Sequence, residues 1–298
     1  MIVDTFTKPQ GLKGKAKAVV MVVLKMIQKA WEIIINPNTW TKKRSWVWAL
    51  VFLRCAYLFM NEYGLNPLKK SIKGDHVFLT GAGSGIGQGM AIKLGQMGCK
   101  LSLSDINVES LKETVDLCVK AGVKAENIYT FYCDVSSSQS IKEGASKARD
   151  AFGNVNILIN NAGIVSGKPT MELTDAMMDR TLRVNTISHL HTIKEFLPGM
   201  IASKRGHIVT IASMAGLICI PSLSDYCASK FGAVAIDEAV RLELNKDGHS
   251  SYVKTTCICP YFISTGMFNG AKKAFPMYIL TPQEVVDRIV AAIQQEEL

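Results

Sequence analysis

A tyrosine and a lysine four residues apart are the side chains with the clearest chemical potential in this 298-residue chain. Tyr226 and Lys230 lie in the run Tyr-Cys-Ala-Ser-Lys, and this spacing places both on one face of a helix. A nearby ammonium favours the phenolate and lowers the pKa of a phenol from about 10. Such a tyrosine can exchange a proton with an alcohol or a carbonyl near neutral pH. The pair therefore predicts acid–base chemistry at a substrate oxygen.

A glycine-rich run upstream predicts a dinucleotide site. Residues 80–87 read Thr-Gly-Ala-Gly-Ser-Gly-Ile-Gly, between an expected strand and an expected helix. Gly81 permits a tight turn, and Gly85 and Gly87 let the backbone approach a pyrophosphate at the helix N-terminus. Together with the tyrosine–lysine pair, the loop predicts hydride transfer. The expected cofactor contacts in the loop are Gly81, Ser84, Gly85, Ile86 and Gly87.

An acidic residue at the next strand end indicates which dinucleotide binds. Asp105 follows the second expected strand, where a carboxylate can bind both ribose hydroxyls and would repel a 2′-phosphate. Ser84 supplies no cation for that phosphate. We therefore expect NAD rather than NADP, with Asp105 and Ile106 as contacts. The alternative role for Asp105 is a helix cap, because Asn107 and Glu109 begin another helix.

Two further strand ends carry candidate cofactor contacts. Asp134 and Val135 lie at the end of the third expected strand and could hold the adenine edge. Asn161, Ala162 and Gly163 follow the fourth strand and place small residues and amides against the cofactor. Taken alone, both segments are equally compatible with ordinary turns.

From His76 onward, short branched runs alternate with amphipathic stretches. Strands separated by helices predict an α/β fold with a doubly wound parallel sheet and helices on both faces. Ligands in such sheets bind beyond the carboxyl ends of the strands, where all these motifs fall. The expected strands are His76–Thr80, Lys100–Ser104, Ile128–Asp134, Ile157–Asn160, His207–Ala212 and Val253–Ile258. The expected helices are Ile86–Met97, Glu109–Lys120, Ser138–Phe152, Asp175–Met200, Ser224–Leu244 and Pro282–Gln294.

The charge of the chain is concentrated near its N-terminus. The formal net charge is +9; residues 1–75 hold 13 Lys or Arg and 4 Asp or Glu, and the remainder holds 21 of each. This distribution suits an anionic membrane surface and argues against a nucleic-acid partner. Eight cysteines without a C-x-x-C pair indicate a reducing compartment. His189 and His191 fall on divergent helical faces, so no metal site is expected.

Residues 1–73 are expected to form a helical, membrane-associating extension and linker, ahead of a catalytic domain at 74–298. Lys25, Lys29 and Glu32 share one stripe of a helix that is otherwise apolar, as in helices lying in a membrane interface. The apolar stretch Trp46–Met60 would reach about 22 Å as a helix, short of the roughly 30 Å hydrocarbon core. We therefore expect a monotopic anchor. A true span and a soluble arm packing on another subunit are the alternatives.

These motifs resemble the short-chain dehydrogenase/reductase superfamily over about residues 74–294. Its Thr-Gly-x-x-x-Gly-x-Gly, Asn-Asn-Ala-Gly and Tyr-x-x-x-Lys motifs occur here in the expected order. The resemblance implies that Ser213 and Asn185 are the catalytic serine and asparagine, and that Lys230 also holds the nicotinamide ribose. Further expected cofactor contacts, on the carboxamide side, are Pro260, Ile263 and Thr265.

Four segments are similar to the retinol dehydrogenase and 17β-hydroxysteroid dehydrogenase branch: Lys194–Pro198, Gly206–Thr210, Asp225–Gly232 and Thr265–Phe268. This resemblance implies a retinoid, steroid or lipid alcohol as substrate. It also implies a homodimer on the endoplasmic reticulum membrane or lipid droplets, with the catalytic domain facing the cytosol. Tyr261 departs from the glycine that many members have there, and its bulk is expected to reshape the pocket.

In the expected reaction, Tyr226 takes the hydroxyl proton while hydride passes from the substrate carbon to the nicotinamide. Ser213 hydrogen-bonds the substrate oxygen and stabilises its developing charge. Asn185, by resemblance, holds a water that links Lys230 to solvent. Two other functions fit the same motifs. One is an NADPH-dependent reductase of lipid carbonyls, and the other is a non-catalytic lipid-droplet or complex scaffold built on this fold.

Overall fold

The computed structural model describes residues 69–264 and 279–296. The chain divides into two units, Met1–Leu68 and Lys69–Leu298, and the predicted membrane-associating extension falls on the first, outside the described residues. The second unit includes residues 69–73, which the sequence analysis assigned to the linker. Within the described ranges, no helix is both long enough and apolar enough to cross a bilayer.

Six parallel strands form one sheet in the order β3-β2-β1-β4-β5-β6. The central strands β1, β4 and β5 are buried along their whole length, which is why they read as nearly continuous apolar runs. The strand order reverses between β1 and β4, and such a reversal opens a crevice at the carboxyl ends. The predicted doubly wound sheet is confirmed. The strands are β1 (His76–Thr80), β2 (Lys100–Asp105), β3 (Ile128–Tyr132), β4 (Ile157–Asn160), β5 (Gly206–Ile211) and β6 (Val253–Ile258).

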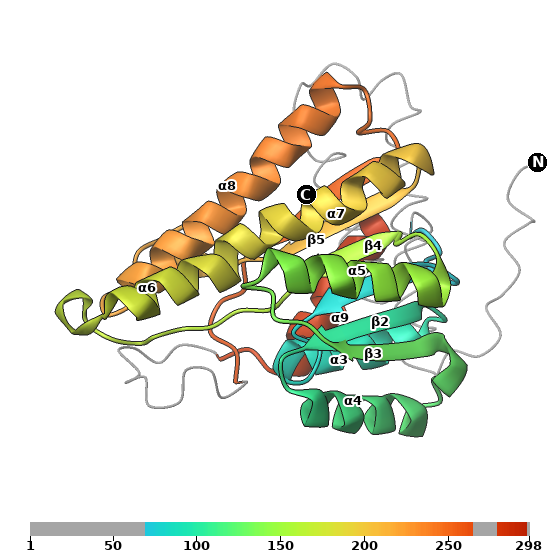
Figure 1. Cartoon of the computed structure of the whole chain (residues 1–298), viewed down its shortest axis with the longest axis horizontal. Helices are drawn as coiled ribbons and strands as arrows, with labels where there is room; N and C mark the ends of the chain where they lie inside the picture. Colours follow the sequence, from blue (N-terminus) through green and yellow to red (C-terminus); the bar gives the residue numbers. More distant parts are fainter. Residues whose placement is uncertain (1–68, 265–278, 297–298) are drawn as a thin grey trace, which may run out of the picture. The chain divides into compact units, whose positions relative to one another are not determined.

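Helices cover both faces of the sheet (Figure 1). Alternation along β1 sends Val77 and Leu79 into one core and Phe78 into the other. Helices α3 (Gly85–Gln96), α4 (Val108–Lys120) and α9 (Pro282–Gln295) pack on the first core. Helices α5 (Ser138–Phe152), α7 (Ser188–Ala202) and α8 (Ser224–Lys246) pack on the second.

Most expected elements match the structure to within one or two residues at each end, and two differences have a clear physical reason. The helix expected over Asp175–Met200 is present from Asp175 to Ala202, but a π-helical turn that was not expected, Arg183–Ile187, divides it into α6 (Asp175–Leu182) and α7. Strand β3 ends at Tyr132 rather than Asp134. The reason is that the Asp134 carboxylate accepts bonds from the amide (2.9 Å) and hydroxyl (2.7 Å) of Ser136, which turns the chain.

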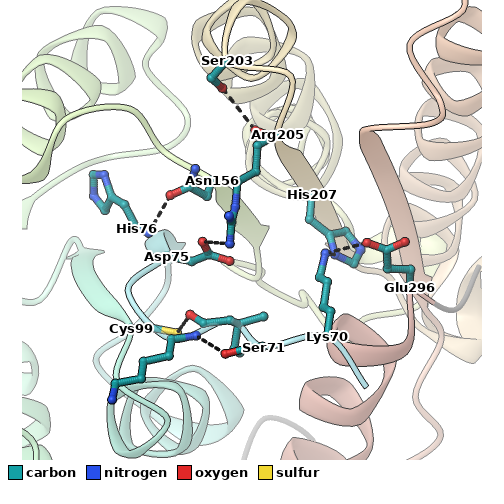
Figure 2. A network of polar contacts seen from close by, with 12 residues as sticks. Lys70, Ser71, Asp75, His76, Cys99, Asn156, Ser203, Arg205, His207 and Glu296 are labelled. Carbon is teal, nitrogen blue, oxygen red and sulfur yellow. Dashed lines mark hydrogen bonds and ion pairs between the residues drawn. The ribbon is translucent and has the colours of Figure 1, made fainter. Parts of the chain in front are cut away.

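A polar network fastens the first described residues to the amino ends of the strands (Figure 2). Lys70 Nζ lies 2.9 Å from Glu296 at the end of α9, and the same carboxylate lies 3.7 Å from Lys254 of β6. Asp75, just before β1, pairs with Arg205, just before β5. Ligands bind at the carboxyl ends of parallel strands, so these ion pairs lie at the opposite end of the sheet from the expected ligand site.

Candidate active site

A cleft of about 590 Å³ opens at the carboxyl ends of the strands, a volume within the usual range for small-molecule sites. The structure brings the predicted cofactor contacts together there; only Thr265 lies outside the described residues. What each residue binds stays a prediction. The lining residues that the sequence analysis named are Gly81, Ser84, Gly85, Ile86, Gly87, Asp105, Ile106, Asp134, Val135, Asn161, Ala162, Gly163, Ser213, Tyr226, Lys230, Pro260, Tyr261 and Ile263.

Two glycines of the loop after β1 are packed too closely to carry a side chain. Gly81 has φ 66°, in the left-handed region, and a Cβ there would lie 2.8 Å from Ala162 Cα. A Cβ on Gly87 would lie 2.7 Å from Asn161 Nδ2 and closer still to Gly81 O. The Ser84 side chain does not cap α3, which leaves the first-turn amides to an anion. The loop therefore fits the pyrophosphate of a dinucleotide.

Thr80 holds this loop in place, a role that the sequence analysis missed. Its Oγ1 accepts hydrogen bonds from the amides of Asn161 (3.0 Å) and Ala162 (3.1 Å) and donates to Ile159 O (3.3 Å). Asn161 Nδ2 donates in return to Thr80 O and Gly81 O, at 2.9 and 3.0 Å. These bonds join the ends of β1 and β4 where the strand order reverses. A hydroxyl residue directly before the first glycine was the available signal.

Asp105 faces the glycine loop, and a backbone amide holds each of its two carboxylate oxygens. Oδ2 accepts from Gly83 N at 2.9 Å, and Oδ1 accepts from Asn107 N at 3.0 Å. The helix-cap alternative for Asp105 is wrong, because Asn107 caps α4 with its own side chain. Each carboxylate oxygen can accept a second bond. Asp105 can therefore bind two hydroxyl donors without releasing the loop.

Tyr226 lies in the first turn of α8 and contributes its phenol to the cleft wall. The residue is 4% exposed, and its hydroxyl hydrogen-bonds that of Ser213, which follows β5. Burial raises the pKa of Tyr226, and the Ser213 hydrogen bond opposes this effect. The prediction that the phenol pKa is lowered is therefore wrong for this arrangement, because desolvation outweighs the favourable contacts.

Lys230 lies against the ring of the tyrosine. Its Nζ is 5.8 Å from the ring centroid and donates to Ile211 O at 2.8 Å. The residue is 3% exposed, and burial lowers the pKa of the amine to about 8. The sequence predicted the proximity of the two side chains correctly. It could not predict that burial would disfavour both of their charged forms.

Asn185 lies in the π-helical turn and does not line the cleft. Its Oδ1 accepts from Ile164 N (2.8 Å), and its Nδ2 donates to Ile164 O (2.8 Å) and Ser229 Oγ (3.0 Å). The side chain therefore ties the loop after β4 to α8. The predicted water at Asn185 stays a prediction.

The cleft also contains residues that no sequence motif indicated. Val165 follows β4, Arg180 belongs to α6, and Val184 lies in the π-helical turn. Tyr261, the departure noted in the sequence, packs edge-on against Phe262 with ring centroids 5.1 Å apart. Val165, Val184 and Tyr261 give part of the cleft an apolar wall that suits a hydrophobic ligand, and Arg180 adds a positive charge.

Comparison with known proteins places this arrangement in a family. The family model described as short chain dehydrogenase matches residues 75–274. The chain belongs to the short-chain dehydrogenase family. Epidermal retinol dehydrogenase 2 of Homo sapiens is 42% identical over 232 residues, which cover 77% of this chain and 74% of that protein. Estradiol 17-beta-dehydrogenase 11 of Macaca fascicularis is 40% identical over 248 residues, covering 83% and 81%.

Two solved structures of short-chain dehydrogenases share the fold. One, from Burkholderia phymatum in complex with NAD, is 30% identical with a TM-score of 0.63, covering 77% of this chain and 82% of that chain. The other, a metagenomic enzyme in complex with NADP, has the same identity and TM-score, covering 76% and 92%. The predicted superfamily and its retinol and 17β-hydroxysteroid dehydrogenase branch are confirmed. This dehydrogenase is an oxidoreductase that acts on CH–OH groups with a nicotinamide cofactor.

Proposed function

We propose that this dehydrogenase uses NAD to oxidise a hydrophobic alcohol of the retinoid or hydroxysteroid type, with Tyr226 as the acid–base residue. One observation carries the proposal: the hydrogen-bonded Tyr226 and Ser213 hydroxyls line the same cleft as the glycine loop and Asp105. The names of the retinol and estradiol dehydrogenases that it resembles support the substrate class.

The Ser213 and Tyr226 hydroxyls would bind the substrate oxygen together. In the oxidative direction, Tyr226 takes the alcohol proton while Ser213 donates a hydrogen bond to that oxygen. Because only the phenolate can accept this proton, Lys230, 5.8 Å from the ring centroid, supports the step by supplying positive potential that stabilises the phenolate before the transfer. A bound nicotinamide would accept the hydride. In the reverse direction, the raised pKa of Tyr226 keeps the phenol protonated and able to donate to a carbonyl.

Asp105 supports NAD as the cofactor. Its carboxylate is fixed by Gly83 N and Asn107 N, so its charge points at the position where the adenosine ribose of a dinucleotide would lie. A 2′-phosphate placed there would meet a fixed negative charge. An aspartate at the end of β2 therefore favours the unphosphorylated ribose.

Dimerisation and membrane attachment complete the proposal. Four large apolar side chains are exposed here: Ile187 at the end of the π-helical turn, Leu190 in α7, and Phe231 and Leu242 on α8. They suit packing against a second copy of the chain. The basic excess of residues 1–75 suits an anionic membrane surface. We accordingly place the enzyme on the endoplasmic reticulum membrane or on lipid droplets, with its catalytic domain in the cytosol.

The test is a substrate screen with the full chain reconstituted in phospholipid vesicles. Retinol, estradiol and a long-chain fatty alcohol are each supplied with NAD or NADP, and reduced cofactor is followed by its fluorescence. NAD-dependent turnover of retinol or estradiol that Tyr226→Phe abolishes supports the proposal. The corresponding carbonyls are supplied with NADH or NADPH in a parallel assay, and turnover with NADPH alone would favour the reductase function. If none of these compounds is oxidised or reduced, the result would favour the non-catalytic scaffold.

A further inference from the structure

Two cysteines with neighbouring side chains occur at the end of β6. Cys257 lies in the strand, and Cys259 follows it by two residues; we call them the thiol pair. The ladder between β5 and β6 continues past the end of the strand, because Met214 N donates to Pro260 O at 2.9 Å. The backbone of the pair is therefore extended, and residues two apart in an extended backbone point to the same face.

The face that the thiol pair shares is the one that α8 covers. Val253, four residues before Cys257, packs in the second core, under α5, α7 and α8, whereas Ile258 packs against the first core. The two side chains of the pair hydrogen-bond each other. Both interact electrostatically with Lys230 and Asp237 of α8. The two sulfurs thus lie together between β6 and the helix that carries the active-site lysine.

The thiol pair also contacts the segment that carries Ser213. The backbone of Ser213 hydrogen-bonds the Cys259 side chain. Lys230 Nζ donates to Ile211 O at 2.8 Å, and Ile211 pairs with the residue between the two cysteines. Pro260, which follows the pair directly, lines the cleft. A change in the distance between the two sulfurs would therefore displace Ser213 and the wall of the cleft beside it.

One sulfur of the pair is poised to be a thiolate. The hydrogen bond from Cys257 lowers the pKa of Cys259, and the backbone of Ser213 and the charge of Lys230 act in the same direction against burial. The same hydrogen bond, together with burial, raises the pKa of Cys257, which keeps its proton. Burial raises the pKa of Cys118 to about 11, as expected for an unreactive thiol. The thiol pair, in contrast, is only half-buried, so a small oxidant can reach it.

We propose that the thiol pair is an oxidation site at which a peroxide closes a disulfide and stops the dehydrogenase reaction. The Cys259 thiolate attacks one peroxide oxygen, so that an S–O bond forms and the O–O bond breaks. The oxygen that leaves takes up the proton that Cys259 had released. The Cys257 sulfur then attacks this sulfenic acid: the S–S bond forms, the S–O bond breaks, and hydroxide leaves with the Cys257 proton as water. The peroxide gains two electrons, and each sulfur gives up one.

The backbone places this disulfide near the limit of the usual geometry. Residues two apart in an extended strand have Cα atoms about 6.6 Å apart, and disulfides occur from about 4.4 to 6.8 Å. Closing the bond therefore strains the end of β6, and strained disulfides are readily reduced. The bond also removes the thiol that contacts the backbone of Ser213, so we expect a loss of activity that a thiol reductant reverses. This loss, unlike the disulfide itself, rests on the proposed function of Ser213.

Peptide mapping of the unmodified full chain tests the bond. Trypsin releases Thr255–Lys272, which contains the thiol pair and no other cysteine. After hydrogen peroxide and alkylation of the remaining thiols, this peptide should lack two hydrogen atoms and carry no alkyl group. Dithiothreitol should restore alkylation at both cysteines. A peptide that is still alkylated at both cysteines after peroxide, or that gains oxygen on one cysteine without losing hydrogen, overturns the proposal.

The activity of variants tests the consequence. Peroxide should stop NAD-dependent oxidation of the alcohol, and dithiothreitol should restore it. In Cys259→Ser, inactivation should be slower by more than about tenfold, because a hydroxyl lacks the reactivity of a thiolate. In Cys257→Ser, inactivation should persist but resist dithiothreitol, because a sulfenic acid without a partner thiol is oxidised further. The matched control, Cys219→Ser, removes an exposed cysteine and should behave like the unmodified enzyme.

Two results of the activity assay would contradict the proposal. One is an unchanged rate of inactivation in folded Cys259→Ser, and the other is full turnover by enzyme whose peptide carries the disulfide. Should the enzyme turn over no alcohol, the proposed function fails, while the peptide mass still decides whether the disulfide forms.

Discussion

Replacing Asp105 by Ala should reverse or erase the preference for NAD over NADP. The carboxylate already accepts one backbone amide on each oxygen, from Gly83 at 2.9 Å and Asn107 at 3.0 Å. One further acceptor position on each oxygen is then available for the two ribose hydroxyls. A hydrogen bond to a charged group contributes about 1.5–3 kcal/mol. Allowing for water that replaces the carboxylate, we expect a loss of about 2–3 kcal/mol, or roughly 30- to 150-fold in the Kd for NAD.

The affinity for NADP should change in the opposite direction. Removing the fixed negative charge relieves its repulsion of a 2′-phosphate, so the Kd for NADP should fall or stay constant. The measured quantity is the ratio of the two Kd values, from titration of the apo-enzyme by calorimetry. Asp105→Ala also removes acceptors for two backbone amides, so a thermal melt must show that the variant is folded.

Two further variants separate the ribose contact from other effects. Asp105→Asn keeps one carbonyl acceptor but removes the charge, so it should give an intermediate ratio. Asp134→Asn removes a charge from another strand end in the same cleft and should leave the ratio unchanged. If Asp105→Ala weakens the binding of NAD and of NADP by the same factor, the carboxylate stabilises the loop and does not contact the ribose. An unchanged ratio in a folded variant would refute the reasoning outright.

Three other substitutions test separate parts of the site. Tyr226→Phe should lower kcat by about 10²- to 10⁴-fold, the usual contribution of acid–base catalysis, while the Kd for NAD stays nearly constant; retained turnover would contradict the proton-transfer role. Gly87→Ala should weaken NAD binding by more than about 100-fold, because its Cβ would collide with Gly81 O, a backbone atom that cannot yield locally. Gly199→Ala, where the added Cβ meets nothing closer than 3.5 Å, is the control in a binding titration. Lys230→Met should stabilise the apo-enzyme at pH 7, because the native pKa of about 8 lies below the ordinary 10.5, so the native state loses stability as pH falls between these values. Keeping the charged amine buried at pH 7 lowers the free energy of unfolding by about 3 kcal/mol, and the lost hydrogen bond to Ile211 O offsets about 1 kcal/mol of the gain in the variant. Chemical denaturation should therefore show Lys230→Met to be more stable than the unmodified enzyme by about 2 kcal/mol at pH 7, and by less at pH 10. An equal difference in stability at both pH values would contradict this prediction.

Most of the sheet could be predicted because its strands are buried on both faces and separated by turn-forming residues. The π-helical turn could not be predicted, since Arg183–Ile187 contains neither Gly nor Pro and its sequence suits an ordinary helix. Asn185 binds both main-chain groups of Ile164, 21 residues earlier in the chain. Local sequence cannot reveal a partner at that separation.

The residues of the cleft could be predicted more readily than their electrostatics. Spacing and strand ends indicate which side chains gather, because parallel strands finish at one edge. The pKa of Tyr226 depends instead on how deeply the phenol is buried, which follows from the packing of α8 against β5.

The ion pairs of Glu296 with Lys70 and Lys254 lie at the opposite end of the sheet from the cleft. The five-residue strand β1 spans about 16 Å between these ion pairs and the glycine loop. A force applied through the residues ahead of Lys69 would act on the start of β1 and the end of α9, which lie away from the cleft. We therefore expect that a segment fused upstream of Lys69 to attach the enzyme to a chosen surface would leave its kinetics unchanged.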